Sequence, residues 1–349
     1  MKHQTTRYGE IPFYKIGTFG NTADAFISKK LFLEYRTKYS FPKKGDILIS
    51  ASGTIGRAVI YDGKPAYFQD SNIVWIDNDE TLVKNDFLFY AYSNVKWNTE
   101  HTTILRLYND NFRNTLIPLP PLNEQSTIAN ILSALDRYLC ALDALILKKE
   151  GVKKALSFEL LSQRKRLKGF NQAWQRVRLG DIANYLISNL SAEQITQQGK
   201  IKVYDVNNFI GYTDTTFISD KPYISIVKDG SVGRVRILPP KTNILSTMGA
   251  LIANHRTTTE FLFYLLSNFD FKNFTSGSII PHIYFKDYKE KTIFLPPLNE
   301  QSAIANILSD LDNEIASLKN KKRQFENIKK ALNHDLMSAK IRVLKKSVL

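Results

Sequence analysis

An internal repeat limits what this 349-residue chain can fold into more than any other feature of its sequence. The string LPPLNEQS stands at residues 119–126 and again at 295–302, and the longer segments 119–136 and 295–312 differ at only two positions. The tetrapeptide KKAL recurs at 153–156 and 329–332 in the same register. Agreement of this length in one register indicates an internal duplication. The shift that carries residue 119 onto residue 295 is called the repeat offset below.

A helical pattern follows each Pro-Pro pair, which ends whatever structure comes before it. Apolar residues recur there at alternating steps of four and three. Such spacing over roughly forty residues predicts a helix of about 60 Å with a narrow seam that one partner helix covers. The two helices are natural partners, although each can instead pack on its own neighbouring domain. The seam residues are Ile128, Leu132, Leu135, Leu139, Leu142, Ile146, Leu156 and Leu160, then Ile304, Leu308, Leu311, Ile315, Leu318, Phe325, Leu332 and Leu336.

About 120 residues before each helix are rich in β-branched and aromatic residues and in turn signals. Examples are GDILISASGTIGRAVIYDG at 45–63 and KPYISIVKDGSVGRVRILPP at 221–240. The two segments share little sequence beyond the Gly-x-x-Gly-Arg pattern, whereas the two helical segments are nearly identical. We therefore expect the two helices to have the same function and the two domains to have different ones. The predicted fold is α+β, with two strand-rich domains and two long coiled-coil helices that form an internal repeat. The predicted parts are residues 1–118, 119–168, 169–294 and 295–349.

Composition points to a polyanionic partner. The formal net charge is +15, and such a field attracts nucleic acid, although charge can also serve solubility alone. One cysteine and five scattered histidines give no disulfide and no zinc pattern, so we expect no metal and no cofactor. Cys140 is expected to be a small core residue. No apolar run approaches the roughly 18 residues that a membrane span needs, and the first residues lack the apolar segment of a signal peptide. We therefore expect a cytoplasmic protein.

Catalytic signatures are missing from the sequence. All three Pro-Pro pairs follow leucine, at Leu119, Leu238 and Leu295, whereas adenine methyltransferases need Asn or Asp there. The chain has no phosphate-binding loop of the Gly-x-x-x-x-Gly-Lys type and no Pro-Asp dipeptide to open a nuclease motif. We therefore expect a non-catalytic protein.

The chain resembles the specificity subunit of type I restriction-modification enzymes. The resemblance lies in the doubled LPPLNEQ that opens a long helix, in the two Gly-x-x-Gly-Arg turns and in WQRVRLGDIANY at 174–185. It implies two target-recognition domains separated by two long helices that pack antiparallel, which gives the chain pseudo-twofold symmetry. Each domain is then expected to read half of an interrupted DNA site. The resemblance also implies helices that dock two methyltransferase subunits and, through them, restriction subunits. The chain departs from the pattern because no WxxVxLGDI opening precedes YGEIPFYKIGTFGN at 8–21, and the connection from there to GTIGR is longer than in the second copy.

Candidate DNA-binding residues lie in matching places of the two domains. Glycine lets a backbone approach phosphates closely, arginine offers a planar donor fork, and hydroxyl, amide and imidazole groups can bond to base edges. Hairpin turns with solvated arginines, ordinary loop polarity and turn asparagines are the alternative interpretations. The candidates are Tyr14, Lys15, Thr54, Arg57, Arg106, Asn109, Asn111 and Arg113 in the first domain, and Asn207, Asn208, Ser231, Arg234, Ser276, Ser278, His282 and Lys286 in the second.

Four residues of the repeated string are candidates for binding a partner protein: Glu124, Gln125, Glu300 and Gln301. A carboxylate in the first turn of a helix also favours the helix dipole, and Asn123 or Asn299 can cap the helix. Contact with a methyltransferase subunit is what the resemblance adds.

Two other functions remain open at this stage. A coiled-coil scaffold whose strand domains bind protein would read no DNA, and a nuclease working alone without a metal would cut it. The fixed spacing that two rigid helices would set between two different readers favours sequence recognition, with unspecified bases between the half-sites.

Overall fold

The computed structural model describes residues 4–68, 72–97 and 106–343. The chain divides into two compact units, residues 1–143 with 321–349 and residues 144–320, and each long helix contributes to both units. In the described part, no helix is both long and apolar enough to cross a membrane.

The first unit contains two three-stranded sheets. One sheet has the order β2-β1-β5, with β1 antiparallel to β2 and parallel to β5, and the other has the antiparallel order β4-β3-β6. Strand β3 is buried along its whole length, which agrees with the apolar run Ile-Leu-Ile at its start. The elements are β1 (Ile11–Tyr14), β2 (Ala25–Ile27), α1 (Lys29–Lys38), β3 (Ile47–Ser50), β4 (Ala58–Ile60), β5 (Tyr67–Phe68), β6 (Ile73–Trp75), α2 (Asn85–Tyr92) and α3 (Asn109–Arg113).

The second unit repeats both sheets and enlarges one of them. Order β10-β9-β13 matches β2-β1-β5, and β12-β11-β14 matches β4-β3-β6 but gains β8 at one edge. Two-stranded sheets β15-β16 and β17-β7 complete the unit. The elements are β7 (Gln175–Arg178), η1 (Leu179–Asp181), β8 (Ala183–Ile187), η2 (Ala192–Gln194), β9 (Ile201–Tyr204), β10 (Phe209–Thr213), β11 (Tyr223–Val227), β12 (Val235–Leu238), β13 (Thr242–Ile244), β14 (Met248–Ala253), α5 (Thr259–Ser267), η3 (Lys272–Phe274), β15 (Thr275–Ser276), β16 (His282–Ile283), α6 (Phe285–Tyr288) and β17 (Thr292–Leu295).

The longer connection expected in the first domain contains α1, which has no counterpart helix in the second unit. Ser28 caps this helix with its side chain. The first domain is thus a variation on the second, with an added helix and without counterparts of β7 and β8 among its described residues.

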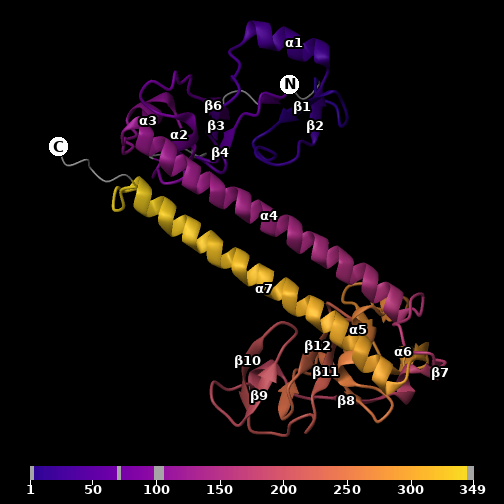
Figure 1. Cartoon of the computed structure of the whole chain (residues 1–349). Helices are drawn as coiled ribbons and strands as arrows, with labels where there is room; N and C mark the ends of the chain where they lie inside the picture. The colour runs from indigo at the N-terminus through magenta and orange to yellow at the C-terminus, as the bar shows by residue number, and fades with distance from the viewer. Residues whose placement is uncertain (1–3, 69–71, 98–105, 344–349) are drawn as a thin grey trace. The chain divides into compact units, whose positions relative to one another are not determined.

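The two predicted long helices are present as α4 (Leu122–Leu161) and α7 (Leu298–Met337), each 40 residues long. All sixteen seam residues are buried or partly buried. In the first unit Lys322 pairs with Asp143 and Lys329 with Asp136, and in the second unit Lys149 pairs with Glu314. Residue numbers rise on α4 as they fall on α7, so within each unit the two helices are antiparallel (Figure 1).

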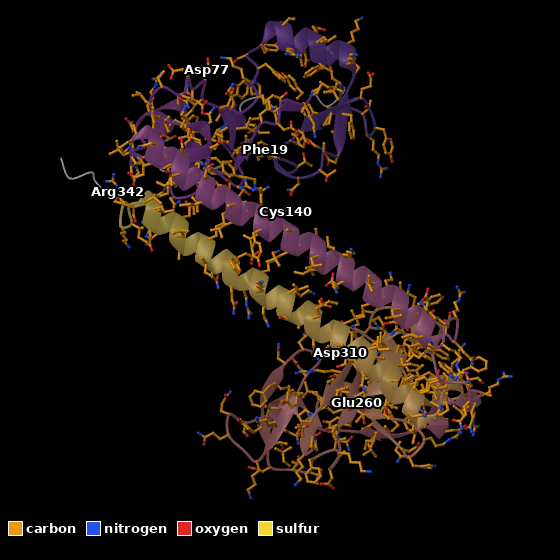
Figure 2. All side chains as sticks on the ribbon, viewed as in Figure 1. Phe19, Asp77, Cys140, Glu260, Asp310 and Arg342 are labelled. Atoms are coloured by element: carbon orange, nitrogen blue, oxygen red, sulfur yellow. The ribbon has the colours of Figure 1, made fainter. Side chains whose placement is uncertain are left out.

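One prediction about the helices is wrong. Cys140 is exposed on α4 (Figure 2) rather than buried as a core residue. Its neighbour Leu142 is buried at 5% exposure, and a residue two positions away in a helix points about 200° round the axis, away from the seam.

Candidate nucleic-acid interface

Each unit carries a Gly-x-x-Gly-Arg loop between two antiparallel strands, built on the same backbone frame. In the first unit the N–H of Ser50 donates to the carbonyl of Arg57 at 2.9 Å, and in the second the N–H of Val227 donates to that of Arg234 at 2.9 Å. The two glycines of each loop have positive φ, between 68° and 82°, which only glycine adopts without strain. The expected hairpin is therefore present twice.

The arginine of each loop holds the loop that follows the early strand of its own domain. Arg57 donates from Nη1 to the carbonyl of Phe19 at 3.0 Å, and Arg234 donates from Nη2 to Oδ1 of Asn207 at 2.9 Å. Two residues that the sequence marked independently, Asn207 and Arg234, thus lie together, and both are exposed. Asn208 lies next to them on the surface.

The Asn207 turn depends on a residue that sequence reasoning missed. Oδ1 of Asp205 accepts the N–H groups of Asn207 at 2.7 Å and Asn208 at 2.6 Å, which is the hydrogen-bond pattern of an aspartate turn. An aspartate two residues before an asparagine pair is the signal that could have predicted it. The aspartate thus holds this turn through the backbone N–H groups of the two asparagines and not through their side chains.

Beside each loop, one residue of the loop faces one residue of a later segment across an antiparallel bridge. The bridge joins Asp229 to His282 in the second unit and Ser52 to Arg106 in the first. Nδ1 of His282 lies 2.7 Å from Oδ1 of Asp229. The same frame thus presents different polar groups in the two units.

In the first unit Asn72 joins the polar pair at this bridge. Its Oδ1 accepts the hydroxyl of Ser52 at 2.7 Å and Nη2 of Arg106 at 3.3 Å. Asn72 was not predicted from the sequence, because it precedes a different strand.

Other candidates surround the bridge of the second unit. Ser231, Ser276, Ser278 and Lys286 are exposed, and the hairpin tip between β15 and β16 also exposes Ile279 at 92%. Lys286 lies over the ring of Tyr284 at 5.6 Å. Ser276 pairs with His282 in the β15-β16 hairpin, which places it directly beside the bridge.

In the first unit Thr54, Asn109 and Arg113 are exposed. Arg113 lies 3.5 Å from Asp110 on α3, as a solvent-exposed ion pair. Residues 102–105 of the segment that was expected to carry further polar contacts lie outside the described residues.

Three candidates of the first domain have partners of their own. Asn111 is buried, at 9% exposure, and its Oδ1 accepts the N–H of Tyr108 at the start of α3, so it acts as a cap rather than a surface group. Tyr14 is partly buried and stacks on Phe68 at 5.6 Å. Lys15 pairs with Asp24 at 2.8 Å but keeps 43% of its side chain exposed. Asn111 and Tyr14 thus have internal partners, and contact of either side chain with DNA stays a prediction.

The glutamines of the repeated string are fully buried and tie three segments together. Oε1 of Gln125 accepts the N–H of Lys84, which caps α2, and its Nε2 donates to the carbonyls of Leu82 and Pro120. Gln301 repeats this with Thr258, which caps α5, and with the carbonyls of Arg256 and Pro296. Each glutamine therefore joins a Pro-Pro pair, a long helix and a short helix of its domain.

The glutamates of the string are also buried, and each holds an arginine from just beyond the end of the other long helix. Arg342 donates to both oxygens of Glu124 at 2.8 and 2.6 Å, and Arg166 donates to those of Glu300 at 3.1 and 2.6 Å. Arg342, labelled in Figure 2, is the counterpart of Arg166 at the repeat offset. The guanidinium of Arg342 lowers the pKa of the Glu124 carboxyl below its usual value.

These four side chains therefore have internal partners. Glu124, Gln125, Glu300 and Gln301 are all 2% exposed or less, and the described structure gives each of them a role within its own unit. Direct contact between them and a methyltransferase subunit stays a prediction.

Further along the helices, a tyrosine of each domain binds an aspartate of that domain's long helix. The Tyr90 hydroxyl donates to Asp136 at 2.7 Å, and Tyr264 donates to Asp312 at 2.9 Å. Burial and the neighbouring carboxylate raise the pKa of both tyrosines, so both remain protonated donors. The repeat thus extends from the sequence to the way in which each domain is fixed to its helix.

Comparison with known protein families agrees with this doubled architecture. A model described as the type I restriction modification DNA specificity domain matches residues 1–149 and 171–327. The chain belongs to the type I restriction-modification DNA specificity family. The resemblance read from LPPLNEQ and its helix is thereby confirmed.

Relatives in this family cover different shares of the chain. S.HindORF215P of Haemophilus influenzae, a candidate type I restriction enzyme specificity subunit, is 64% identical over 133 residues, which are 38% of this chain and 34% of that protein. The MjaVIII specificity subunit of Methanocaldococcus jannaschii is 25% identical over 362 aligned positions, covering 92% of this chain and 84% of that protein. The chain thus spans about a third of the first relative and most of the second.

A solved structure shares the fold. The S subunit of a type I restriction-modification system from M. genitalium superposes with a TM-score of 0.62 at 20% identity, over 97% of this chain and 91% of that one. The predicted α+β architecture with long helices is confirmed.

Proposed function

We propose that this chain reads an interrupted, two-part DNA sequence, with one half-site read by each unit. The observation that carries the proposal is the shared loop frame that presents Ser52 and Arg106 in one unit but Asp229 and His282 in the other. A base edge in the major groove is identified by its pattern of donors and acceptors. One frame with two polar sets therefore favours two different half-sites.

Cationic groups around each loop support a role in holding the DNA backbone. Arg57, Arg234 and Lys286 are exposed, and the chain as a whole carries a formal charge of +15. Lysine and arginine that neutralise phosphates supply affinity without reading sequence. We assign the phosphates to these residues and the bases to the bridge residues beside them.

The partners of the proposed function follow from the family. We propose that the chain is itself non-catalytic, and that two methyltransferase subunits and, through them, restriction subunits bind along α4 and α7. One solved relative, with a TM-score of 0.56 at 19% identity, was studied for complex assembly and conformational transition of a type I system. The gap between half-sites would then be set by the length of the two helices. The protein would act in the cytoplasm, where the DNA is.

The direct test is a genome-wide map of methylated adenines in cells that express this chain with its methyltransferase partners. We expect a split motif with a fixed, unspecified gap. A matched strain with Arg57→Ala and Arg234→Ala should show reduced modification of that same motif. A short continuous palindrome would contradict the two-reader proposal, and failure of the complex to bind duplex DNA at low and high salt would favour a scaffold instead.

A further inference from the structure

Residues 116–119 of the first unit are the sequence counterpart of strand β17. The stretch LIPLPPL at 116–122 aligns with TIFLPPL at 292–298, at the same repeat offset that relates the two long helices. In the second unit β17 pairs with β7 in antiparallel register, from Thr292 with Arg178 to Leu295 with Gln175. Among the described residues of the first unit, 116–119 pairs with no strand.

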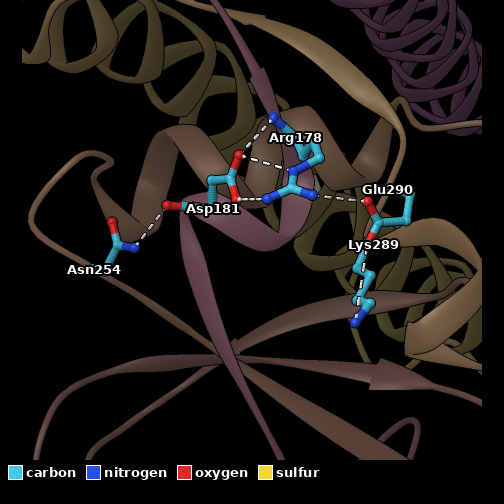
Figure 3. Close-up of polar contacts among 5 residues, drawn as sticks. All are labelled: Arg178, Asp181, Asn254, Lys289 and Glu290. Atoms are coloured by element: carbon cyan, nitrogen blue, oxygen red, sulfur yellow. Dashed lines mark hydrogen bonds and ion pairs between the residues drawn. The ribbon is translucent and has the colours of Figure 1, made fainter.

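Strand β7 covers apolar side chains in the second unit. Leu295 and Ile293 are 4% and 8% exposed there, and Trp174, directly before β7, is 8% exposed. Arg178 at the end of β7 binds Asp181 and Glu290 through its guanidinium (Figure 3). The strand is thus fixed at both of its ends.

Without such a strand among the described residues, Leu119 faces solvent, whereas Ile117, the counterpart of Ile293, is partly buried against the core of the first unit. Leu119, the counterpart of Leu295, is 52% exposed, and Leu116 is 93% exposed. An exposed apolar edge whose backbone pairs with no strand is a template for pairing with another one. Residues 116–119 therefore combine an exposed apolar side chain with a backbone that pairs with no described strand, and strand addition uses both features.

Pro118 fits this pairing, although proline cannot donate a hydrogen bond. In the second unit the N–H of Leu179 donates to the carbonyl of Lys291. Antiparallel pairs alternate between bonded and non-bonded positions, so residues 293 and 295 bond to β7 and residue 294 does not. Pro118 is the counterpart of residue 294. The N–H groups of Ile117 and Leu119 are those that a docked strand would use.

A cavity beside this edge matches the position of the Trp174 ring. It has a volume of about 130 Å³, and its lining includes Leu119, Glu124, Ile128, Leu336 and Arg342. Their counterparts at the repeat offset are Leu295, Glu300, Ile304, Leu160 and Arg166. Three of these belong to the same buried cluster as Trp174, and Oε2 of Glu300 accepts the Trp174 indole N–H at 3.0 Å.

We propose that the first unit binds one further β-strand, antiparallel to residues 116–119, whose sequence follows the Trp-x-x-Val-x-Leu pattern of 174–179. The occupant is a partner segment with a tryptophan at the start of an extended stretch. Its indole would fill the cavity and donate to the carboxylate of Glu124, as Trp174 does with Glu300. This inference does not rest on DNA recognition.

The test uses a fluorescein-labelled peptide with the sequence of residues 171–182 and the full-length protein. We expect a saturable rise in anisotropy, and at least tenfold weaker binding both for the peptide with Trp174→Ala and for the protein with Leu119→Asp. The matched control protein carries Phe294→Asp, because Phe294 is also 52% exposed but lies where β7 is already paired. It should bind like the unchanged protein.

Three outcomes would overturn the proposal. The first is peptide binding that does not saturate, and the second is saturable binding that Leu119→Asp leaves unaffected. The third is an unchanged chain that light scattering shows to be a dimer and that Leu119→Asp converts to a monomer, which would make a second copy the occupant. Circular dichroism melting of each variant shows that the substituted proteins are folded, since both altered side chains are half-exposed.

Discussion

The Arg166 guanidinium donates to both carboxylate oxygens of Glu300, from Nε at 3.1 Å and from Nη2 at 2.6 Å. Arg342 and Glu124 form the same pair in the first unit. In each unit the pair joins the residues just after one long helix to the first turn of the other. The backbone turn before each arginine is also copied, since Gln163 and Ala339 have φ of 62° and 56°.

Removing the charge of Glu300 should destabilise the second unit. Glu300 is fully buried and also accepts the Trp174 indole N–H. Glu300→Gln removes the negative charge opposite the Arg166 guanidinium and leaves one acceptor oxygen for these two donors. The substitution should lower the free energy of unfolding by about 2 kcal/mol. Urea denaturation measures this cost. Glu290→Gln is the control, because Glu290 and its partner Arg178 are more than half exposed, and it should change the free energy by less than about 0.5 kcal/mol. Equal effects of the two substitutions would contradict the role of burial.

Acid should weaken the first unit through Glu124. Because Arg342 lowers the pKa of this carboxyl in the folded state, the pair stabilises the fold above the unfolded pKa, and that stability is lost as the pH falls through the folded pKa. Melting temperatures measured between pH 3 and pH 7 should fall below about pH 4.5, and less steeply in Glu124→Gln. An identical acid slope in the two proteins would show that the pair does not contribute.

The two glycines of the second loop should differ in their tolerance of alanine. Both have positive φ, but a Cβ on Gly233 would lie 2.6 Å from the Phe271 ring, whereas a Cβ on Gly230 would have no atom within 4 Å. Gly230→Ala should cost about 1 kcal/mol from backbone strain alone, and Gly233→Ala about 3 kcal/mol once overpacking is added. Thermal unfolding of both variants tests this order, and a Gly230→Ala that is as damaging as Gly233→Ala would argue against it.

Exchanging the bridge residues should change one half of the recognised sequence. Asp229→Ser combined with His282→Arg gives the second unit the bridge residues of the first. Because one well-placed polar contact discriminates between bases by about 1–3 kcal/mol, the preferred bases of one half-site should change. Methylation mapping should then show the other half-site and the gap unaltered, and these serve as internal controls. A change in both half-sites would show that the bridge does not act locally.

Helix length should set the gap. Insertion of one heptad at matched positions of α4 and α7 keeps the seam in register and adds about 10 Å to each helix. At about 3.4 Å per base pair, the unspecified gap should grow by about three base pairs, with both half-sites unchanged. An insertion in α4 alone is the control, and it should abolish specific methylation. A gap that stays constant in the doubly lengthened protein would rule out this role of the helices.

The sequence predicted the helices well and the site only in part, for a physical reason. Periodicity is a local property, so the seam from Ile128 to Leu336 could be located without any three-dimensional information. Which strand lies beside which loop depends on distant pairing. Asn72 and Asp229 therefore escaped notice, although Arg106 and His282, their partners, were found.

The repeated glutamates and glutamines have internal partners that the sequence analysis did not identify. The resemblance implied that they contact a methyltransferase subunit, and in the structure Glu300 and Gln301 are completely buried. The signal that could have revealed this was Arg166, which recurs as Arg342 at the repeat offset in a segment that otherwise differs. An arginine that recurs in both copies after the end of a helix predicts a carboxylate partner, here Glu300 and Glu124.

Gln125 and Gln301 of the repeated string fix each domain to the first turn of its long helix. Each amide holds a Pro-Pro carbonyl, the capping N–H of a domain helix and a loop carbonyl at once. A recognition domain can therefore tilt on the first turn of its long helix only by breaking all of these bonds together. The repeated string therefore forms a rigid junction between each long helix and its own domain, and not a hinge.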